Sequence, residues 1–323
     1  MHPSRAETTP LEPLADPAAR DRAMAVLDWA ASVAEERATP AVTPARPEDL
    51  IALSKLDPKT VRDALDRVIM GADPEAGLDA LLEGGALSAI FPEVHAMIGF
   101  GDGEWRHKDV WKHTKQVVRQ AVPRLEVRWS SLFHDIGKVK TRTISESGKV
   151  QFLGHAEVGT RMFDKFDRRM GLFAPEAALK ESVRFLILHH LRAAQYEPGW
   201  TDSAVRRFAR EMGCHLEDLL CLSRADITTK RPEKKRKGLN QIEELAARIR
   251  ELAEQDAVVP PLPKGVGDEI MKAFGLPPSR LIGDLKKKLE AEVDAGEVEG
   301  HQPSEYYVEI VRKDPARYGI PSS

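Results

Sequence analysis

The sequence predicts an all-α protein. Asp-Pro pairs at Asp16-Pro17, Asp57-Pro58 and Asp73-Pro74 each place a preferred N-cap residue before a proline at the first helical position. Apolar residues recur with helical spacing through most of the 323 residues. Strand-like alternation is scarce and is arguable only at residues 150–153. These patterns favour a helical bundle with flanking helical modules.

The first predicted segment, residues 1–47, combines a disordered N-terminus, one helix and a linker. Residues 1–15 are rich in Pro, Thr and Glu, a composition typical of disordered termini. Helical spacing of apolar residues predicts a helix over residues 16–37. Three prolines then mark residues 38–47 as the linker.

Residues 48–95 are predicted to form a second, short helical module. One helix is expected to begin at Asp57-Pro58 and another at Asp73-Pro74. Gly84-Gly85 interrupts the helical pattern, and Phe91-Pro92-Glu93 is expected to close the module.

The remaining chain is predicted to divide into residues 96–237 and 238–323. Helical patterns run from about residue 107 to 228, and a charged amphipathic helix is expected over residues 238–255. After the proline-rich break at residues 260–263, two helical segments are expected within residues 266–297, followed by a short tail that carries the pair Tyr306-Tyr307.

Composition excludes several classes of protein. Hydrophobic residues make up 42% of the chain, too many for a disordered protein. No apolar run approaches the roughly 20 residues that span a bilayer, and no apolar signal segment is visible at the N-terminus. Cys214 and Cys221 lie seven residues apart in a helical pattern, about 10 Å, too far for a disulfide. We expect a cytoplasmic protein without a membrane partner.

The net charge of −3 conceals an uneven distribution. Residues 106–250 contain 30 Lys and Arg against 18 Asp and Glu, whereas both flanking regions are acidic. This pattern predicts an anionic ligand for the middle of the chain, although clustering on solvated helix faces would look the same. Aromatic residues make up only 6%, which favours phosphate contacts over base stacking.

Histidines and aspartates gather in the same basic region, on apolar helix faces. Any one of them alone is better explained as a core histidine or a helix cap. Several such groups directed inward along one bundle indicate a metal site, because buried charges are rare unless they are paired or bound to metal. Imidazole with carboxylate suits Mn, Fe, Ni, Zn or Mg. The candidate ligands are His113, His134, Asp135, His155, His189, His190 and Asp226.

The order His113, His134-Asp135, Asp226 resembles the H…HD…D signature of the HD superfamily of metal-dependent phosphohydrolases. The string Phe133-His134-Asp135-Ile136-Gly137-Lys138 is similar to the HDxGK form of its motif. The resemblance implies one or two divalent metals, with His155 and one or both of His189 and His190 at the second. Asp135 and Lys138 are the expected catalytic residues; Lys138 would contact phosphate, or is an ordinary surface lysine.

A wider resemblance covers about residues 48–300. The strings at residues 103–114, 205–208, 222–228 and 275–283 are similar to the helical RNA-binding body and HD region of bacterial tRNA nucleotidyltransferases and poly(A) polymerases. The polymerase head of that family is not expected. No Asp-x-Asp occurs, Gly84-Gly85 is not followed by the family's arginine and aspartate, and 47 residues are too few for such a domain.

These resemblances imply a phosphodiesterase and phosphatase that acts on nucleotides or RNA ends, including 2′,3′-cyclic phosphates, by attack of a metal-activated water on phosphorus. Two other HD branches, the guanosine-tetraphosphate and cyclic-di-GMP hydrolases, match less well. The alternative is a catalytically idle RNA-binding module that keeps a structural metal site. The basic run at residues 230–237 would guide a nucleic acid or nucleotide, or is a solvated loop. The oligomeric state stays open. Candidate substrate-binding residues are Lys140, Arg142, Arg206, Arg207, Lys230 and Lys234.

Overall fold

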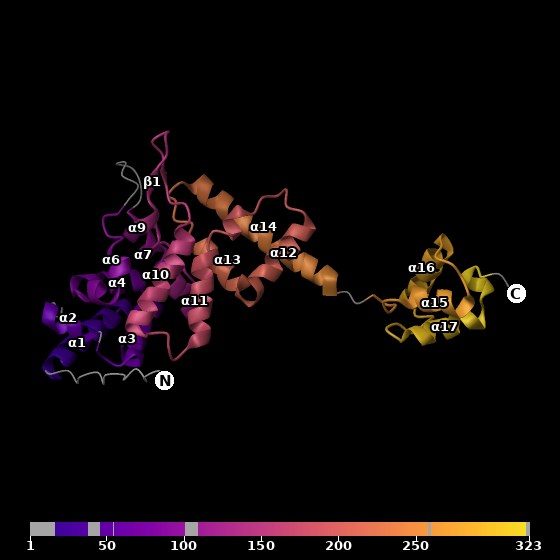
Figure 1. Cartoon of the computed structure of the whole chain (residues 1–323), viewed down its shortest axis with the longest axis horizontal. Helices are drawn as coiled ribbons and strands as arrows, with labels where there is room; N and C mark the ends of the chain where they lie inside the picture. The colour runs from indigo at the N-terminus through magenta and orange to yellow at the C-terminus, as the bar shows by residue number, and fades with distance from the viewer. Residues whose placement is uncertain (1–16, 38–45, 54, 101–108, 258–259, 321–323) are drawn as a thin grey trace, which may run out of the picture. The chain divides into compact units, whose positions relative to one another are not determined.

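The computed structural model describes residues 17–37, 46–53, 55–100, 109–257 and 260–320. Within them the fold is all-α, with one two-stranded hairpin (Figure 1). The predicted disorder of residues 1–15 and most of the predicted linker lie outside these residues. The chain divides into two compact units, residues 1–249 and 250–323, and the division falls inside one helix, α14. The boundaries predicted at residues 47, 95 and 237 stay predictions.

The first unit begins with helices that the sequence marks by their caps. Asp57 accepts a hydrogen bond from the backbone N–H of Thr60, and Asp73 accepts one from Ala76, as expected for N-cap aspartates before proline. Phe91-Pro92 starts another short helix, which ends at His95, and the expectation that this segment closes the module stays a prediction. The helices are α1 (Pro17–Ala34), α2 (Pro47–Leu53), α3 (Pro58–Met70), α4 (Pro74–Glu83), α5 (Ala86–Ile90) and α6 (Pro92–His95).

Helices from the histidine-rich region complete the first unit and share its hydrophobic core, which runs continuously from α1 to α11. Aromatic rings at its centre, including Phe91, Trp129 and Phe133, contact one another. The elements are α7 (Val110–Gln120), α8 (Leu125–Phe133), α9 (Lys138–Thr141), α10 (His155–Met170), α11 (Ala177–His189), α12 (Asp202–Met212) and α13 (Leu216–Ala225), with short 3-10 turns at Ala193–Gln195 and Gly213–His215.

A buried arginine fastens the two groups of helices together. Arg128 of α8 donates hydrogen bonds to the backbone oxygens of Ile69 in the last turn of α3, of Gly71 just after α3, and of Ala121 just after α7. Carbonyl oxygens at the end of a helix have no hydrogen-bond donor within that helix. The guanidinium of Arg128 supplies the donors that these buried oxygens would otherwise lack.

Between α9 and α10 the chain forms the hairpin of β1 (Thr143–Ile144) and β2 (Val150–Gln151), which are antiparallel. The strand suggested by residues 150–153 therefore exists, although it is two residues long. In Figure 1 the hairpin extends beyond the neighbouring helices. Helix α14 (Pro232–Ala257) begins before residue 238, so residues 232–237 of the basic run belong to a helix, and Lys230 and Arg231 directly precede it.

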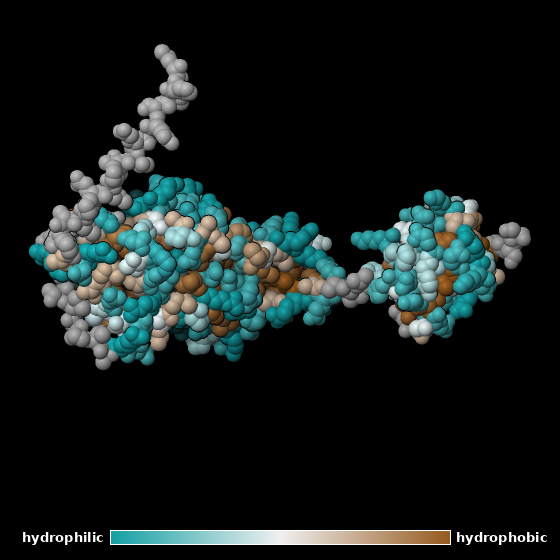
Figure 2. Space-filling view, turned by 90° about the horizontal axis from the view of Figure 1, so that it is seen from below, coloured by the Kyte–Doolittle hydropathy of each residue, from teal (hydrophilic) through white to brown (hydrophobic). Residues whose placement is uncertain are grey.

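The second unit has its own core, in which Val266, Leu285 and Tyr307 are buried. It contains α15 (Val266–Phe274), α16 (Arg280–Asp294), α17 (Ser304–Lys313) and a 3-10 turn at Ala316–Tyr318. The first two helices match the predicted pair, whereas α17 forms where only a tail was expected. In the view of Figure 2 both units show mostly hydrophilic surfaces with smaller apolar areas. No helix of the described residues is long and apolar enough to cross a membrane. Cys214 and Cys221 are free thiols.

Candidate metal centre

Helix ends bring the candidate ligands together. His134, His190 and Asp226 are the residues that directly follow the last turns of α8, α11 and α13. Because the C-terminal end of a helix carries a partial negative charge, three such ends around one point favour a cation there. His155 starts α10, and His113 lies in the first turn of α7, which Asp109 caps by accepting hydrogen bonds from Trp111 and Lys112.

Close packing at a glycine sets the distance between Asp135 and α10. A β-carbon on Gly137 would lie 2.0 Å from the backbone oxygen of His155 and 2.6 Å from the nitrogen of Gly159. Only glycine therefore allows the turn after α8 to lie directly on the start of α10.

The first ligand set contains two histidines and two aspartates. The Nε2 atoms of His113 and His134 lie 3.4 and 3.3 Å from Asp135 Oδ2, and 3.3 Å from each other. Asp226 Oδ1 lies 3.0 Å from His113 Nε2 and 3.6 Å from His134 Nε2. Four ligand atoms from three helix ends thus lie close together, since His134 and Asp135 both follow α8.

The second set uses the other oxygen of the same carboxylate. Asp135 Oδ1 lies 3.5 Å from His155 Nε2 and 4.0 Å from His190 Nε2, and the two Nε2 atoms are 3.2 Å apart. Asp135 is therefore shared by two groups of side chains, each able to hold a metal ion: His113, His134 and Asp135, and Asp135, His155 and His190.

All four imidazoles are oriented by a bond on the opposite ring nitrogen. The Nδ1 atoms of His134, His155 and His190 each lie 2.8 Å from a backbone oxygen, and that of His113 lies 2.8 Å from the Thr228 hydroxyl. A carbonyl oxygen only accepts, so those three Nδ1 atoms carry a proton and their Nε2 atoms face the centre.

Burial and charge act differently on the two sets. Burial lowers the pKa of His155, and it lowers the pKa of His190 to about 4, so both rings are neutral at neutral pH. Two lone pairs then face each other across 3.2 Å with no proton between them, a contact that a cation relieves. Neutral imidazoles and a carboxylate that converge in this way fit a divalent transition metal.

In the first set the carboxylates dominate. Burial alone would lower the pKa of His134, but Asp135 and Asp226 outweigh it and raise the pKa to about 10. Burial would likewise raise the pKa of Asp135 and of Asp226, but the facing histidines hold both well below the usual value. The site thus retains positive charge between its carboxylates, and a metal ion can take the place of that proton.

Lys138 contacts the shared carboxylate directly. Its Nζ lies 2.6 Å from Asp135 Oδ2 and 5.7 Å from the centre of the Phe152 ring. About a quarter of the lysine side chain (23%) is exposed, as is a third (33%) of the Asp226 side chain, whereas Asp135 is buried. Lys138 and Asp226 are therefore points at which the centre is in contact with solvent.

The other sequence-predicted residues lie away from the six clustered side chains. The ring of His189 stacks on Phe185, 4.3 Å between centroids, and Phe185 also contacts His215. Arg206 and Arg207 lie on α12, which contributes no clustered side chain, and Arg207 is 3.9 Å from Glu211. The candidate cations exposed on the surface are Lys140, Arg142, Lys230 and Lys234.

Two residues that support the centre had no predicted role. Thr228 orients His113. The feature of the sequence that could have identified Thr228 is its position, two residues after Asp226, the last candidate ligand. Gly137 was named only as part of the HDxGK-like string, and nothing in the sequence indicates its contact with α10.

A helical bundle with this set of inward histidines and aspartates defines a class of metal-binding domain. Residues 110–231 match the family model of the HD domain, and this stretch, which contains all six clustered residues, is an HD domain of the metal-dependent phosphohydrolase superfamily. The predicted HD resemblance is confirmed.

Curated relatives extend the similarity beyond this domain. The chain is 30% identical over 258 residues to the A-adding tRNA nucleotidyltransferase of Deinococcus radiodurans, covering 77% of this chain and 57% of that protein. It is 31% identical over 261 residues to the CC-adding tRNA nucleotidyltransferase of Thermus thermophilus, covering 77% and 55%. A Multifunctional CCA protein of Ectopseudomonas mendocina is 29% identical over 149 residues, covering 45% and 36%. The matched region thus spans little more than half the length of the first two relatives.

Proposed function

We propose that this chain hydrolyses phosphoesters of nucleotides or RNA ends, 2′,3′-cyclic phosphates included, at the centre built on Asp135. The observation that carries the proposal is the shared carboxylate. One Asp135 oxygen faces His113 and His134, and the other faces His155 and His190. An aspartate placed between two sets of neutral or charge-balanced ligands is suited to hold two cations close together.

When bound, divalent ions supply Lewis acidity, which makes hydroxide available from water near neutral pH and offsets charge on phosphoryl oxygens. The four histidines would hold these ions through Nε2, while Asp135 and Asp226 supply the negative charge. Lys138 is paired with Asp135 Oδ2, and a cation bound at that oxygen would release its ammonium group to contact a phosphate.

Positive charge beside the centre supports an extended anionic substrate. Lys230 and Lys234 are exposed and follow Asp226 along the chain, at the start of α14. Phosphate contacts of this kind position a nucleic acid without reading its sequence. The relatives' names describe enzymes that act on tRNA, which supports an RNA end as the substrate class.

The test is a hydrolysis screen of the full chain, stripped of metal and then supplied with Mn, Ni, Fe, Mg or Zn. The substrates are 4-nitrophenyl phosphate, its bis ester, the 2′,3′-cyclic nucleotides, and 2′- and 3′-mononucleotides. We expect metal-dependent release of phosphate or opening of the cyclic ester. Asp135→Ala is expected to abolish it while circular dichroism shows the helical content unchanged.

Two adjacent histidines provide a matched pair. His190 faces Asp135, whereas His189 stacks on Phe185 outside the cluster. His190→Ala is therefore expected to lose activity at least ten-fold, and His189→Ala is expected to retain most of it. Full activity in His190→Ala would contradict the assigned second ligand set.

The competing function is the idle RNA-binding module, which the exposed basic start of α14 would equally serve. Metal-loaded, folded protein that binds RNA but hydrolyses none of these esters with any of the five metals would overturn the proposed activity and favour the module.

A further inference from the structure

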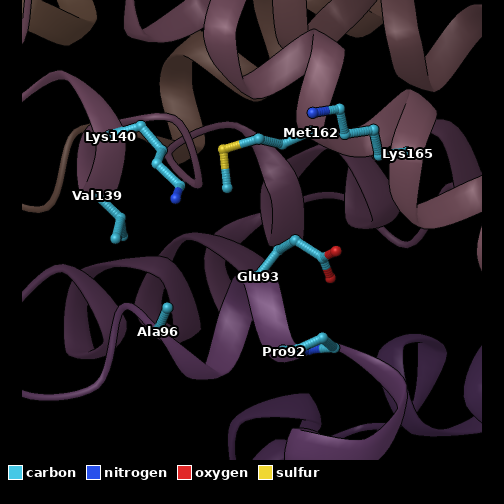
Figure 3. Close-up of a pocket in the computed structure, with 7 residues that line it drawn as sticks. All are labelled: Pro92, Glu93, Ala96, Val139, Lys140, Met162 and Lys165. Carbon is cyan, nitrogen blue, oxygen red and sulfur yellow. The ribbon is translucent and has the colours of Figure 1, made fainter.

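A cavity lies on the α6, α9 and α10 side of the first unit. It encloses about 390 Å³ and is lined by Pro92, Glu93, Ala96, Val139, Lys140, Met162 and Lys165 (Figure 3). None of the six clustered metal-centre residues belongs to this lining. Its size falls within the range of small-molecule sites.

The cavity carries an uncompensated positive charge. Lys140 and Lys165 are both exposed, and among the described residues neither forms an ion pair. The one lining carboxylate, Glu93, is already neutralised, because Arg169 donates to both of its oxygens at 2.8 and 3.0 Å. Two lysines therefore remain for an anion.

The rest of the lining is apolar and adaptable. Met162 and Val139 are partly buried and pack against the hydrophobic core, and Ala96 and Pro92 complete the wall. In Figure 3 Met162 lies between Lys140 on one side and Lys165 on the other. A flexible thioether next to two cations suits a ligand with an anionic group and a flat, less polar body.

The cavity is separate from the metal centre along α10. Met162 and Lys165 follow His155 by seven and ten residues, about 10 and 15 Å along the helix axis.

We propose that this cavity is a binding site for a free nucleotide, with its phosphate between Lys140 and Lys165 and its nucleoside against Met162. Both lysines line this one cavity, which fits one phosphate group better than a continuous strand. The site is independent of the metal centre, so it stands whether or not that centre hydrolyses phosphoesters.

The test measures AMP binding to the full chain by isothermal titration calorimetry, with EDTA present so that the metal centre does not contribute. Inorganic phosphate is the second probe. AMP is expected to bind more tightly than phosphate because only AMP contacts the apolar wall. Lys165→Glu is expected to weaken AMP binding about ten-fold or more, since it replaces a charged hydrogen bond with a repulsive carboxylate.

Two further variants separate charge from shape. Ala96→Phe adds bulk at an exposed position of the wall and is expected to block AMP without altering charge or folding. Lys272→Glu makes the same charge reversal on an exposed residue of the other compact unit and is expected to leave binding unchanged.

Three results would overturn the site as proposed. One is AMP binding that Lys165→Glu and Ala96→Phe leave intact, and another is AMP binding no tighter than that of phosphate. The third is that a short single-stranded oligonucleotide binds at least ten-fold more tightly than AMP and that the same variants abolish this binding. That result would assign the cavity to a nucleic-acid strand. Each of these results is measured in metal-free protein and does not depend on the outcome of the hydrolysis screen.

Discussion

At the scale of single residues, the metal centre depends on how its imidazoles are held from behind. His134, His155 and His190 each bond to the backbone oxygen three positions earlier in the chain. His113 differs, because its partner is the side chain of Thr228, 115 residues away. This ring alone among the four can therefore lose its support through a side-chain substitution.

Thr228→Val removes that hydroxyl while keeping nearly the same side-chain volume. We expect metal affinity to fall about 10- to 100-fold, the usual loss when the partner of a ligating histidine is removed. Competition with a chelating dye measures the affinity. Thr160→Val is the matched control, since that buried hydroxyl bonds only to the backbone oxygen of Ala156. Equal affinity in the two variants would show that Thr228 does not support the centre.

Gly137→Ala tests the close approach of the turn after α8 to α10. The added carbon meets backbone atoms that cannot move aside, so the two segments must separate and Asp135 moves away from His155. We expect a loss of about 1–3 kcal/mol in the free energy of unfolding, together with loss of bound metal.

Urea denaturation and metal analysis of the purified protein measure both effects. Gly199→Ala is the control, because a β-carbon there meets no atom within 4 Å. A Gly137→Ala protein with normal stability and full metal content would contradict the packing role.

The choice between His189 and His190 shows what residue patterns leave undecided. Both follow the same apolar run, and a helical projection places each beside buried neighbours. The structure separates them because α11 ends at His189, and His190 occupies the following position with its ring turned back toward Ile187. The exact residue at which a helix ends depends on tertiary packing, and the local sequence does not determine it.

At the scale of elements, the predictable helices were those with local signals. Asp-Pro caps identify the starts of α3 and α4, because the cap and the proline act within one turn. Helix α6 and strand β1 have four and two residues, too few to display a period. Helix α6 is held by contacts with distant residues, such as that of Arg169 with Glu93, whereas β1 forms by pairing with the nearby β2. The predicted fold class is therefore confirmed, while its shortest elements were not foreseen.

The docking of α2 on α1 should depend on pH through Asp49. This buried carboxylate accepts hydrogen bonds from Arg22 of α1 and from both Nε and Nη2 of Arg46. Those two arginines hold its pKa well below the usual value. A lowered carboxyl pKa adds stability above the unfolded-state pKa of about 3.9, and that stability is lost as the pH falls below it.

Asp49→Asn is accordingly expected to be less stable than the native protein at pH 7, with the difference shrinking toward pH 3. Urea midpoints measured between pH 7 and 3 give this comparison. Asp63→Asn is the control, because its ion pair with Lys59 is exposed and worth little. A difference that stays constant over this range would mean that the Asp49 carboxylate is not the group responsible.

At the scale of the whole molecule, the basic middle of the sequence and the HD domain occupy the same stretch. The expected anionic ligand and the observed metal centre thus belong to one part of the chain. The single core of α1 to α11 was less predictable. Proline-rich residues near 38–47 resemble a linker in the sequence, yet the helices on either side of it pack into one unit.

Metal removal should act on one of the two compact units only. All six clustered residues lie within residues 1–249, whereas residues 250–323 have a core of their own. A ligand present at about 100 times its Kd stabilises the folded state by about 2.7 kcal/mol. For a unit of this size that corresponds to a shift of about 5–10 °C in Tm.

Differential scanning calorimetry of the metal-loaded chain, with and without EDTA, is expected to show two transitions. The larger should move to lower temperature when EDTA is added, and the smaller should stay in place. In Asp135→Ala, EDTA should move neither, because the shared ligand of both sets is gone. Two results would show that the stabilising metal binds elsewhere than at this centre. One is a metal-dependent shift of the smaller transition. The other is a shift of the larger transition in Asp135→Ala that equals the shift in the native protein.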